Sequence, residues 1–241
     1  SIYKLSPNSS GLMIPFLSIK MAKSIFEGVE YVNKFKGNFK FPVIVKPVDR
    51  SGSRGVTKVI LQSELSEAIN YAITESFIKK AIIEEFIDGD EVSVETISYN
   101  GEHTILAITD KVTTGEPHFV ELAHHQPSQL SNEIQEKIKS ETIKCLNALN
   151  INFGAGHSEF KITPNGQVFV IEVGARMGGD FIGSHLVELS TGYDFLEGVI
   201  SVFKHPSFSE EREFRLEWVI GEHINPIDDN EIHFRATENL V

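Results

Sequence analysis

The sequence has little of what several protein classes require. Among its 241 residues there is one cysteine, Cys145, and no long run of lysine and arginine offsets the net charge of −12. A single thiol cannot form an internal disulfide, so a reducing cytoplasm is the simplest setting. The acidic balance argues against a nucleic-acid groove or an anionic membrane surface. The sequence also lacks a signal peptide and any apolar stretch of bilayer-spanning length, so we expect neither nucleic acid nor membrane as a partner.

The composition and the two ends of the chain indicate its size and completeness. Hydrophobic residues make up 41% of the chain, enough for one large domain or two closely packed lobes. The chain begins at Ser1 without an initiator methionine, and it stops soon after a strand-like segment at 214–222. We therefore expect a piece of a longer protein.

Hydrophobic periodicity divides the chain into helices and strands. Apolar residues at helical spacing predict helices at 24–35, 63–75, 131–149, 181–190 and 195–203. Short apolar or alternating runs predict strands at 41–46, 56–61, 81–86, 91–99, 103–111, 152–163 and 167–173. The Asn100-Gly101 pair between two of these strands predicts a hairpin turn. Antiparallel hairpins with flanking helices indicate an α+β fold, in which two sheet-based lobes enclose a cleft.

Two of the predicted helices carry local signals. Ser63 stands where it can cap the helix that follows it. In the long helix at 131–149 the apolar positions expected on one side are Ile134, Ile138, Ile143 and Leu146. Cys145 lies in the same stretch, which predicts a buried thiol rather than a nucleophile.

The first chemical motif is a lysine on a short strand, followed by a loop rich in glycine and serine. Lys46 ends the run Pro-Val-Ile-Val-Lys and supplies a charge that can sit against a phosphate chain. In the loop, Gly52 and Gly55 let backbone N–H groups approach phosphate oxygens, while Ser51 and Ser53 add hydroxyl donors. The lysine precedes the glycines, so this is not a Walker loop, and an ordinary polar hairpin also explains the loop taken alone.

The second motif is an apolar strand that ends in Glu84-Glu85-Phe86-Ile87 and is followed by Asp-Gly-Asp-Glu91. A strand that stops being paired leaves backbone N–H and C=O groups able to hydrogen-bond the edge of an adenine. The carboxylate of Glu91, shortly afterwards, can accept hydrogen bonds from ribose hydroxyls. Acidic residues beside a turn are common, so in isolation this segment also fits a purely structural role.

The third motif is a pair of carboxylates on two apolar strands near the end of the chain's core. Glu159 and Glu172 are flanked by apolar residues, and a buried carboxylate needs a partner. Two of them on adjacent strands form a hard oxygen site suited to Mg²⁺. Arg176 follows Glu172 at alternate spacing and can stabilise negative charge in the same cavity. The alternative is a buried Glu–Arg ion pair, but one arginine does not balance two carboxylates.

In this order the three motifs resemble the ATP-grasp superfamily, and most closely its carboxylate–amine ligases and carbamoyl-phosphate-synthase-like proteins. The resemblance covers roughly Ile14 to Lys204. It implies two lobes with mixed or antiparallel sheets that clasp a nucleotide cleft. The smaller lobe would span 1–90, with a phosphate-covering loop at 49–56, and the larger lobe, with the metal and catalytic residues, would span 91–241.

The resemblance also implies roles for individual residues toward ATP and Mg²⁺, or Mn²⁺ in its place. Lys46 would contact the phosphates, with Ser51, Ser53 and Gly55 in the loop that closes over them. Backbone atoms of Glu85 and Ile87, within the segment Glu84-Glu85-Phe86-Ile87, would bind adenine, and Glu91 would hold the ribose. Glu159 and Glu172 would ligate the metal, Arg176 would serve the transition state, and Lys111 would lie near the γ-phosphate or the carboxylate substrate.

The sequence departs from the family pattern at two points. The second metal strand usually reads Glu-x-Asn-x-Arg, and here Gly174 takes the Asn position. An α/β domain usually comes first in carboxylate–amine ligases, and we expect the native protein to carry it ahead of this chain. His124 and His125 lie where related ligases form a substrate-facing loop, although two solvated histidines are an equal explanation.

The resemblance implies an enzyme that activates a small-molecule carboxylate as an acyl phosphate for attack by an amine. One alternative is a bicarbonate-using reaction of the carbamoyl-phosphate-synthase or biotin-carboxylase kind. Another is a non-catalytic nucleotide-binding module, which Gly174 favours. The sequence leaves open whether the protein forms a homo-oligomer.

Overall fold

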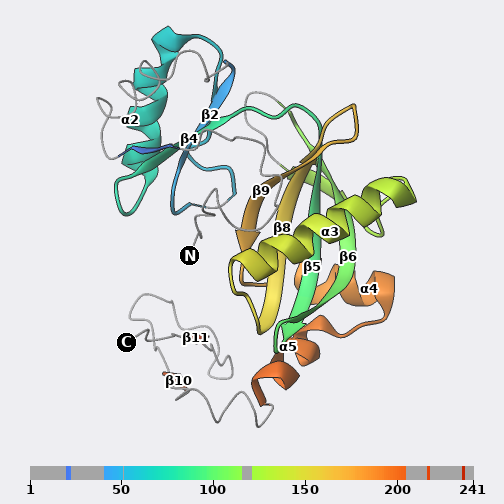
Figure 1. The fold of residues 1–241 in the computed structure, drawn as a ribbon. Helices are drawn as coiled ribbons and strands as arrows, with labels where there is room; N and C mark the ends of the chain where they lie inside the picture. The colour runs from blue at the N-terminus through green and yellow to red at the C-terminus, as the bar shows by residue number, and fades with distance from the viewer. Residues whose placement is uncertain are drawn as a thin grey trace. The chain divides into compact units, whose positions relative to one another are not determined.

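The computed structural model describes residues 41–50, 52–115 and 121–204, together with the backbone of the short strands at 20–22, 216–217 and 235–236 (Figure 1). The chain divides into two compact units, residues 1–199 and 200–241. The first unit holds a four-stranded sheet and a five-stranded sheet, each with a helix packed against it. In the described part of the chain, no helix has the length and apolar character needed to cross a bilayer.

The smaller sheet is antiparallel and packs one apolar face against a helix. Its strand order is β1-β4-β2-β3, with β1 at Lys20–Ala22, β2 at Val43–Pro47, β3 at Thr57–Val59 and β4 at Ala81–Glu85. Val43 and Val45 alternate with partly buried residues on β2, and both pack without exposed surface against Leu65 and Ile69 of helix α2 (Leu65–Glu75). Alternation on the strand thus leaves Ile44 and Lys46 on the opposite face.

The start of α2 differs from the sequence prediction. A 3₁₀ turn, η1 (Gln62–Glu64), precedes the helix, and Ser63 does not cap it. Glu64 instead closes the start of this turn, because one of its carboxylate oxygens accepts hydrogen bonds from the backbone N–H groups of Ile60 at 3.2 Å and Leu61 at 3.0 Å. The tight turn also uses the N–H of Leu65, the first residue of α2, which donates to the carbonyl of Gln62, so the expected Ser63 cap is wrong.

The larger sheet is antiparallel throughout, in the order β7-β6-β5-β8-β9. The strands span Asp90–Tyr99 (β5), Glu102–Thr113 (β6), Glu121–His125 (β7), Gly154–Ile162 (β8) and Val168–Gly174 (β9). Asn100 and Gly101 join β5 to β6 with positive φ angles of 51° and 80°. Both turn residues therefore adopt the left-handed conformation that the Asn-Gly pair predicts, and the hairpin is confirmed.

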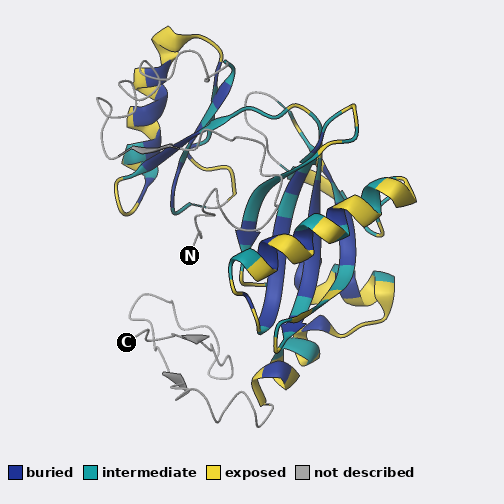
Figure 2. Cartoon of the chain, viewed as in Figure 1, coloured by how far each residue is buried: buried dark blue, intermediate teal, exposed yellow. Residues whose placement is uncertain are grey.

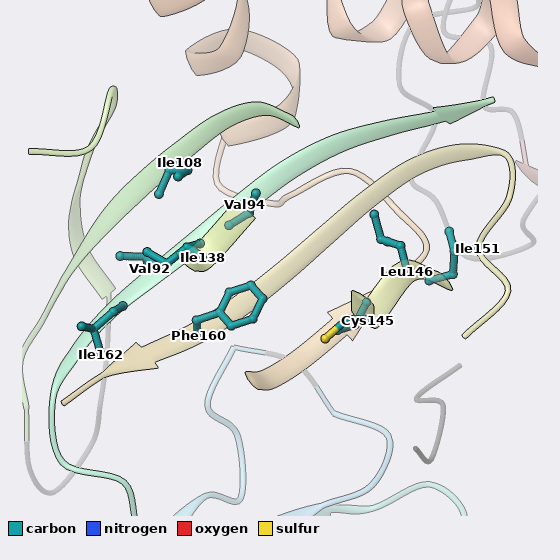
Figure 3. Close-up of a cluster of buried hydrophobic side chains, with 10 residues drawn as sticks. Val92, Val94, Ile108, Ile138, Cys145, Leu146, Ile151, Phe160 and Ile162 are labelled. Carbon is teal, nitrogen blue, oxygen red and sulfur yellow. The ribbon is translucent and has the colours of Figure 1, made fainter. Parts of the chain in front are cut away.

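Helix α3 (Asn132–Ala148) covers one face of the larger sheet (Figure 1). Val92 and Val94 of β5 and Phe160 of β8 point toward it, and they surround Ile138 of the helix (Figure 3). Burial follows the same division, since the strands are buried beneath the helix while its outer side is exposed (Figure 2). This apolar face makes the opposite face of the sheet available for polar residues.

The buried side of α3 is shifted from the predicted stripe. Ile138 and Leu146 have no exposed surface, as expected, and Ile134 packs against them. Ile143, however, is 37% exposed, and Thr142 lies buried in its place. The hydroxyl of Thr142 donates to the carbonyl of Ile138 at 2.8 Å, so the polar group is satisfied within the helix.

The remaining elements follow the larger sheet. A π-helical segment, η2 (Ile182–Leu186), continues into α4 (Val187–Thr191), and α5 spans Phe195–Lys204. Val187 and Phe195 are buried with Ala107 and Ala155 of the sheet. The second unit contains the two-stranded pair β10 (Leu216–Glu217) and β11 (Arg235–Ala236). The helix predicted at 24–35 and most of the segment at 214–222 lie outside the described residues.

We predict that the thiol of Cys145 does not react in the folded protein. Its side chain lies on the buried side of α3, in the core between the helix and the sheet, and burial raises the pKa of the thiol to about 12. Since the thiolate is the reactive species, alkylation by iodoacetamide at pH 8 should proceed only after unfolding in urea. Mass spectrometry before and after addition of urea measures this, and rapid labelling of the folded protein would contradict the buried placement.

We predict that Phe160→Ala lowers the free energy of unfolding by about 3–5 kcal/mol, because the ring is fully buried between the sheet and α3. Urea denaturation measures the change. The control is Leu189→Ala, whose side chain is 83% exposed. It should change stability by less than about 0.5 kcal/mol. Equal effects of the two substitutions would show that Phe160 is not part of the core.

Candidate active site

The polar face of the larger sheet gathers charged side chains from all five strands. The alternating sequence Glu-Val-Ser-Val-Glu of residues 91–95 puts Glu91, Ser93 and Glu95 on the face opposite α3. Register places Glu91 opposite both Lys111 and Lys161, and places Ser93 opposite Glu159. Because directly opposed residues on neighbouring strands are close enough to interact, the register alone brings acids and bases into contact.

One cavity is lined by residues of both sheets. From the smaller sheet and its loops come Ile44, Lys46, Pro47, Arg50, Gly52, Ser53, Arg54, Val56, Glu84, Glu85, Phe86 and Ile87. From the larger sheet and the loop after β9 come Glu91, Glu121, Glu159, Lys161, Val170, Ile171, Glu172 and Arg176. The structure therefore brings together Lys46, Glu159 and Glu172, which lie far apart in the sequence.

Lys46 projects from the face of β2 opposite its apolar core. Its ammonium group lies 2.8 Å from a carboxylate oxygen of Glu84, a diagonal neighbour on β4, where Lys46 itself is opposite Ile82. Burial disfavours the charged lysine, but the carboxylates of Glu84, Glu172 and Glu159 outweigh burial and raise the pKa of Lys46. Lys46 thus stays a cation in the cavity, as contact with an anionic ligand requires.

Glu159 and Glu172 are cross-strand partners on β8 and β9. The ladder shifts register just after this pair, so that Phe160 lies opposite Val170 and Ile171 is an extra residue. This bulge leaves Ile171 and Glu172 both lining the cavity.

The two carboxylates have opposite pKa shifts. Burial raises the pKa of Glu172, and the negative charge of Glu159 raises it further. Burial also disfavours ionised Glu159, but hydrogen bonding from His157 and the charge of Lys111 lower its pKa to about 2. Repulsion between the two acids is what a divalent cation would relieve, and two carboxylates are a suitable donor set for Mg²⁺.

Lys111 lies at the meeting point of three carboxylates. Its ammonium is 3.1 Å from Glu91, 2.6 Å from Glu121 and 3.1 Å from Glu159, and its side chain is only 2% exposed. Burial opposes the charge, but the surrounding carboxylates raise the pKa of Lys111. The three acids line the cavity and Lys111 holds them together from within the sheet. Contact of Lys111 with a γ-phosphate or a substrate stays a prediction.

The segment at the end of β4 was predicted to bind adenine. One edge of its backbone is hydrogen-bonded to the chain beside it, and the other edge faces away from β2. The backbone N–H of Phe86 donates to the carbonyl of Pro42 at 3.2 Å. Since backbone groups alternate in direction along a strand, those of Glu85 and Ile87 point to the opposite edge. Both residues line the cavity. This arrangement is compatible with a donor and an acceptor presented to the edge of a purine.

The loop between β2 and β3 has left-handed backbone at three of the residues predicted to cover a phosphate chain. Gly52, Ser53 and Gly55 have φ angles of 65°, 55° and 75°. A Cβ at Gly55 would lie 2.7 Å from the ring of Pro47, so a larger residue does not fit there. Gly52 and Ser53 line the cavity, whereas Ser51 lies outside the described residues.

Residues 39–184 match the family model of the ATP-grasp domain. The chain belongs to the ATP-grasp family. The predicted resemblance and the α+β fold with antiparallel sheets are thereby confirmed. ATP and Mg²⁺ are the cofactors that this family implies.

Several ATP-grasp relatives are ligases of amino acids. The D-alanine–D-alanine ligase of Flavobacterium johnsoniae is 32% identical over 143 residues, which are 57% of this chain and 43% of that protein. The alanine–anticapsin ligase of Bacillus subtilis is 32% identical over 161 residues, covering 57% of this chain and 34% of that protein. The chain therefore spans less than half the length of these curated relatives.

Solved structures give the same fold. The L-amino acid ligase of Bacillus licheniformis is 30% identical with a TM-score of 0.64, over 80% of this chain and 45% of that one. A biotin carboxylase from Campylobacter jejuni has a TM-score of 0.65 at 22% identity, over 79% of this chain and 44% of that one. At that identity the second similarity concerns the fold alone.

At the Asn position of the ATP-grasp metal strand, Gly174 leaves space that an arginine fills. A Cβ at Gly174 would lie 3.2 Å from Cγ of Arg176, so the stem of Arg176 folds back against this glycine. Its guanidinium donates to the carbonyl of Met177 at 2.9 Å and lies 3.7 Å from a carboxylate oxygen of Glu172. Arg176 lines the cavity, as expected of a residue that meets phosphate or a charged intermediate.

The histidine pair does not form the predicted substrate-facing loop. His124 and His125 are the last residues of β7, paired with Lys111 and Asp110. His124 Nε2 is 3.4 Å from Glu121, and ligand atoms of Glu121, His124 and Asp180 lie within 4.8 Å of one another. Glu121 is already 2.6 Å from the ammonium of Lys111 and Asp180 is exposed, and we assign no metal to this cluster.

Sequence reasoning missed four charged residues of the polar face: Glu95, Glu121, His157 and Lys161. Glu121 and Lys161 line the cavity. His157 contacts Glu159 at 3.1 Å and also contacts Glu95. Strict alternation on β5 could have identified Glu95, because it shares the parity of Glu91. The partners of the other three depend on register between distant strands, which the sequence does not show locally.

We predict that Lys111→Met destabilises the protein most at neutral pH. Removing the ammonium leaves three partly buried carboxylates close together, which should lower the free energy of unfolding by about 3–5 kcal/mol at pH 7. The pKa of Glu159 lies at about 2, below its usual 4.5. Its stabilisation is therefore present above pH 4.5 and lost as the pH falls through 2, so the difference from wild type should shrink in that window.

Urea denaturation at pH 7, 4 and 3 measures this difference. Lys139→Met on the exposed side of α3, where the lysine is 38% exposed, is the control. It should change stability by at most about 1 kcal/mol. A loss in Lys111→Met that stays constant from pH 7 to 3 would mean that the carboxylates are not its cause.

Proposed function

We propose that the chain is the nucleotide-binding and catalytic portion of an ATP- and Mg²⁺-dependent carboxylate–amine ligase. The observation that carries the proposal is one cavity of an ATP-grasp chain lined by a partly buried cation, Lys46, and by the cross-strand acids Glu159 and Glu172. Relatives that join amino acids, at about one third identity, support the same reaction class.

In the proposed reaction a carboxylate oxygen attacks the γ-phosphorus of ATP, and the bond to the β-phosphate oxygen breaks to release ADP. An amine nitrogen then attacks the acyl carbon of the acyl phosphate, inorganic phosphate leaves, and the nitrogen loses a proton. The products are an amide, ADP and phosphate. Phosphoryl transfer of this kind depends on positioning and charge stabilisation more than on covalent chemistry by the protein.

The residues have separate proposed roles. Lys46 and the backbone of the loop at 52–55 bind the phosphate chain, and backbone groups of Glu85 and Ile87 bind adenine. Glu91 holds the ribose. Its two oxygens already accept from Lys111 at 3.1 Å and Lys161 at 3.2 Å, which leaves further lone pairs for hydroxyl donors.

Glu159 and Glu172 would hold Mg²⁺, and Mn²⁺ has the same ligand preference for oxygen. When bound, the metal supplies positive charge for the β- and γ-phosphate oxygens. Arg176 contributes a guanidinium on the same side of the cavity, where it stabilises charge on the transferring group. Lys111 fixes the three carboxylates that line this wall.

The substrates of the protein, its cellular location and its domain boundaries are also proposals. We expect small-molecule carboxylate and amine substrates, with amino acids as the first class to test because relatives named for amino-acid ligation share about one third identity. The single cysteine, Cys145, is buried and reduced, which suits a cytoplasmic enzyme. We further propose a smaller lobe at 1–90, a larger lobe at 91–241 and a preceding α/β domain in the native protein.

Two alternatives remain testable against this proposal. A bicarbonate-dependent reaction shares the fold, as the biotin carboxylase similarity illustrates, but at 22% identity that similarity carries no reaction. A non-catalytic nucleotide-binding module is favoured by Gly174, which supplies no side-chain ligand at the usual Asn position. Each alternative predicts its own dependence of ATP cleavage on added substrate.

The test is phosphate release by the full-length protein with ATP, Mg²⁺ and a matrix of amino acids in pairs. The ligase proposal expects phosphate only when an acid and an amine are both present, together with a product of the summed mass less water. Cleavage that requires bicarbonate would support the carboxylase-like alternative. Tight ATP binding with no cleavage under any condition would support the non-catalytic module.

We predict that Glu172→Ala lowers the rate of ATP cleavage at least about 100-fold, since a metal ligand supplies several kcal/mol to the transition state. Affinity for Mn²⁺ should fall in parallel, as measured by electron paramagnetic resonance. The matched control is Glu136→Ala on α3, whose carboxylate is 71% exposed. A Glu172→Ala enzyme with unchanged Mn²⁺ affinity would remove Glu172 from the metal site.

A further inference from the structure

A second charged network lies inside the first unit, beside the cavity, and its central residues have no assignment to ATP or metal. At its centre is Glu95 of β5, whose side chain has no exposed surface. Among the described residues it is the only acid in the buried class. A buried carboxylate is costly unless its oxygens are paired, so its contacts merit a functional explanation.

Both oxygens of Glu95 are occupied. One contacts Nδ1 of His157, directly across the ladder on β8, and the other accepts a hydrogen bond at 2.9 Å from the backbone N–H of Gly178. The second ring nitrogen of His157, Nε2, lies 3.1 Å from Glu159. A continuous path of polar contacts therefore runs from the backbone at Gly178 through Glu95 and His157 to the proposed metal ligand.

The anchor at Gly178 leaves no room for a side chain. A Cβ at this position would lie 2.5 Å from an oxygen of Glu95 and 2.9 Å from Nδ1 of His157. The loop after β9 thus approaches the network as closely as its backbone allows. Immediately beyond, Asp180 and Phe181 have positive φ angles of 49° and 62°. Two successive left-handed residues that are not glycine require surrounding contacts to hold them.

The same loop carries Arg176 to the cavity. Gly178 is two residues after Arg176, so the hydrogen bond from its N–H to Glu95 restrains the backbone beside the guanidinium. On the other branch, His157 contacts the oxygen of Glu159 that also lies 3.1 Å from Lys111. The carboxylate of Glu95 thereby contacts Gly178, which restrains the loop that carries Arg176. It also contacts His157, which contacts the proposed metal ligand Glu159.

We propose that Glu95 is a positioning residue that fixes the Arg176 loop through Gly178 and the Glu159 carboxylate through His157. The inference rests on the proposed function, because it gives the two ends of the network a shared task in phosphoryl transfer. A fully buried ion pair is seldom the most stable solution for a core position. Its contribution here is geometric, since interactions behind metal ligands and catalytic side chains set their orientation.

The test compares Glu95→Gln and Glu95→Ala with a variant of equal instability on the other face of the sheet. Glu95→Gln keeps the shape and one acceptor but gives up the carboxylate. Ile138→Ala on α3 removes fully buried apolar atoms and leaves the polar face intact. All are made in the full-length protein, and unfolding free energy, kcat and KM for ATP cleavage, and Mn²⁺ affinity are measured.

We expect Glu95→Gln to lower kcat about 10–100-fold, with KM for ATP within about threefold of wild type, and to weaken Mn²⁺ binding about tenfold. Ile138→Ala should lose at least as much stability and keep wild-type kcat and Mn²⁺ affinity. If Glu95→Ala does not fold, the isosteric Glu95→Gln variant carries the comparison.

Two outcomes separate this inference from the proposed function. Glu95→Gln with wild-type kcat and wild-type Mn²⁺ affinity, and only a lower midpoint of unfolding, would overturn the positioning role. A wild-type protein that cleaves no ATP with any substrate would overturn the proposed function. In that case unchanged Mn²⁺ affinity in Glu95→Gln would still count against the inference, and weakened affinity would support it.

Discussion

The buried ammonium of Lys111, with the carboxylates of Glu91, Glu121 and Glu159 around it, is the contact on which the cavity wall depends. Three acids at this density would repel one another and distort the sheet without a cation among them. With Lys111 in place they can line one cavity and still present oxygens to it. The buried ammonium of Lys111 therefore allows the three carboxylates to line the cavity together.

This arrangement is stable because the two faces of the larger sheet are chemically separate. On one face Val92, Val94 and Phe160 pack against α3 and exclude water, and they hold the strands in a single register. On the other face that register determines which acid meets which base. The alternation of apolar and polar residues along these strands thus determines both the core on one face and the charged contacts on the other.

Much of the fold followed from local sequence signals, and part of the site did not. Within the described residues, most strand and helix positions, the Asn100-Gly101 turn and the burial of Cys145 depend on neighbours in sequence, and these predictions were confirmed, whereas the strand β7 was not predicted. Glu95 and His157 lie 62 residues apart in the sequence, on two strands that pair, so no local pattern predicts their contact. Ser63 failed as a cap for a similar reason: a tight 3₁₀ turn, rather than the helix itself, used the first backbone donors.

Because of the bulge in β9, the side chains that line the cavity depend on the number of residues in that strand. The extra residue, Ile171, places an apolar side chain next to the acid of Glu172 in the lining of the cavity. Removing one residue here would turn every following side chain to the other face. During divergence the strand can therefore exchange residues one for one, whereas insertions and deletions would be confined to the turns at its ends.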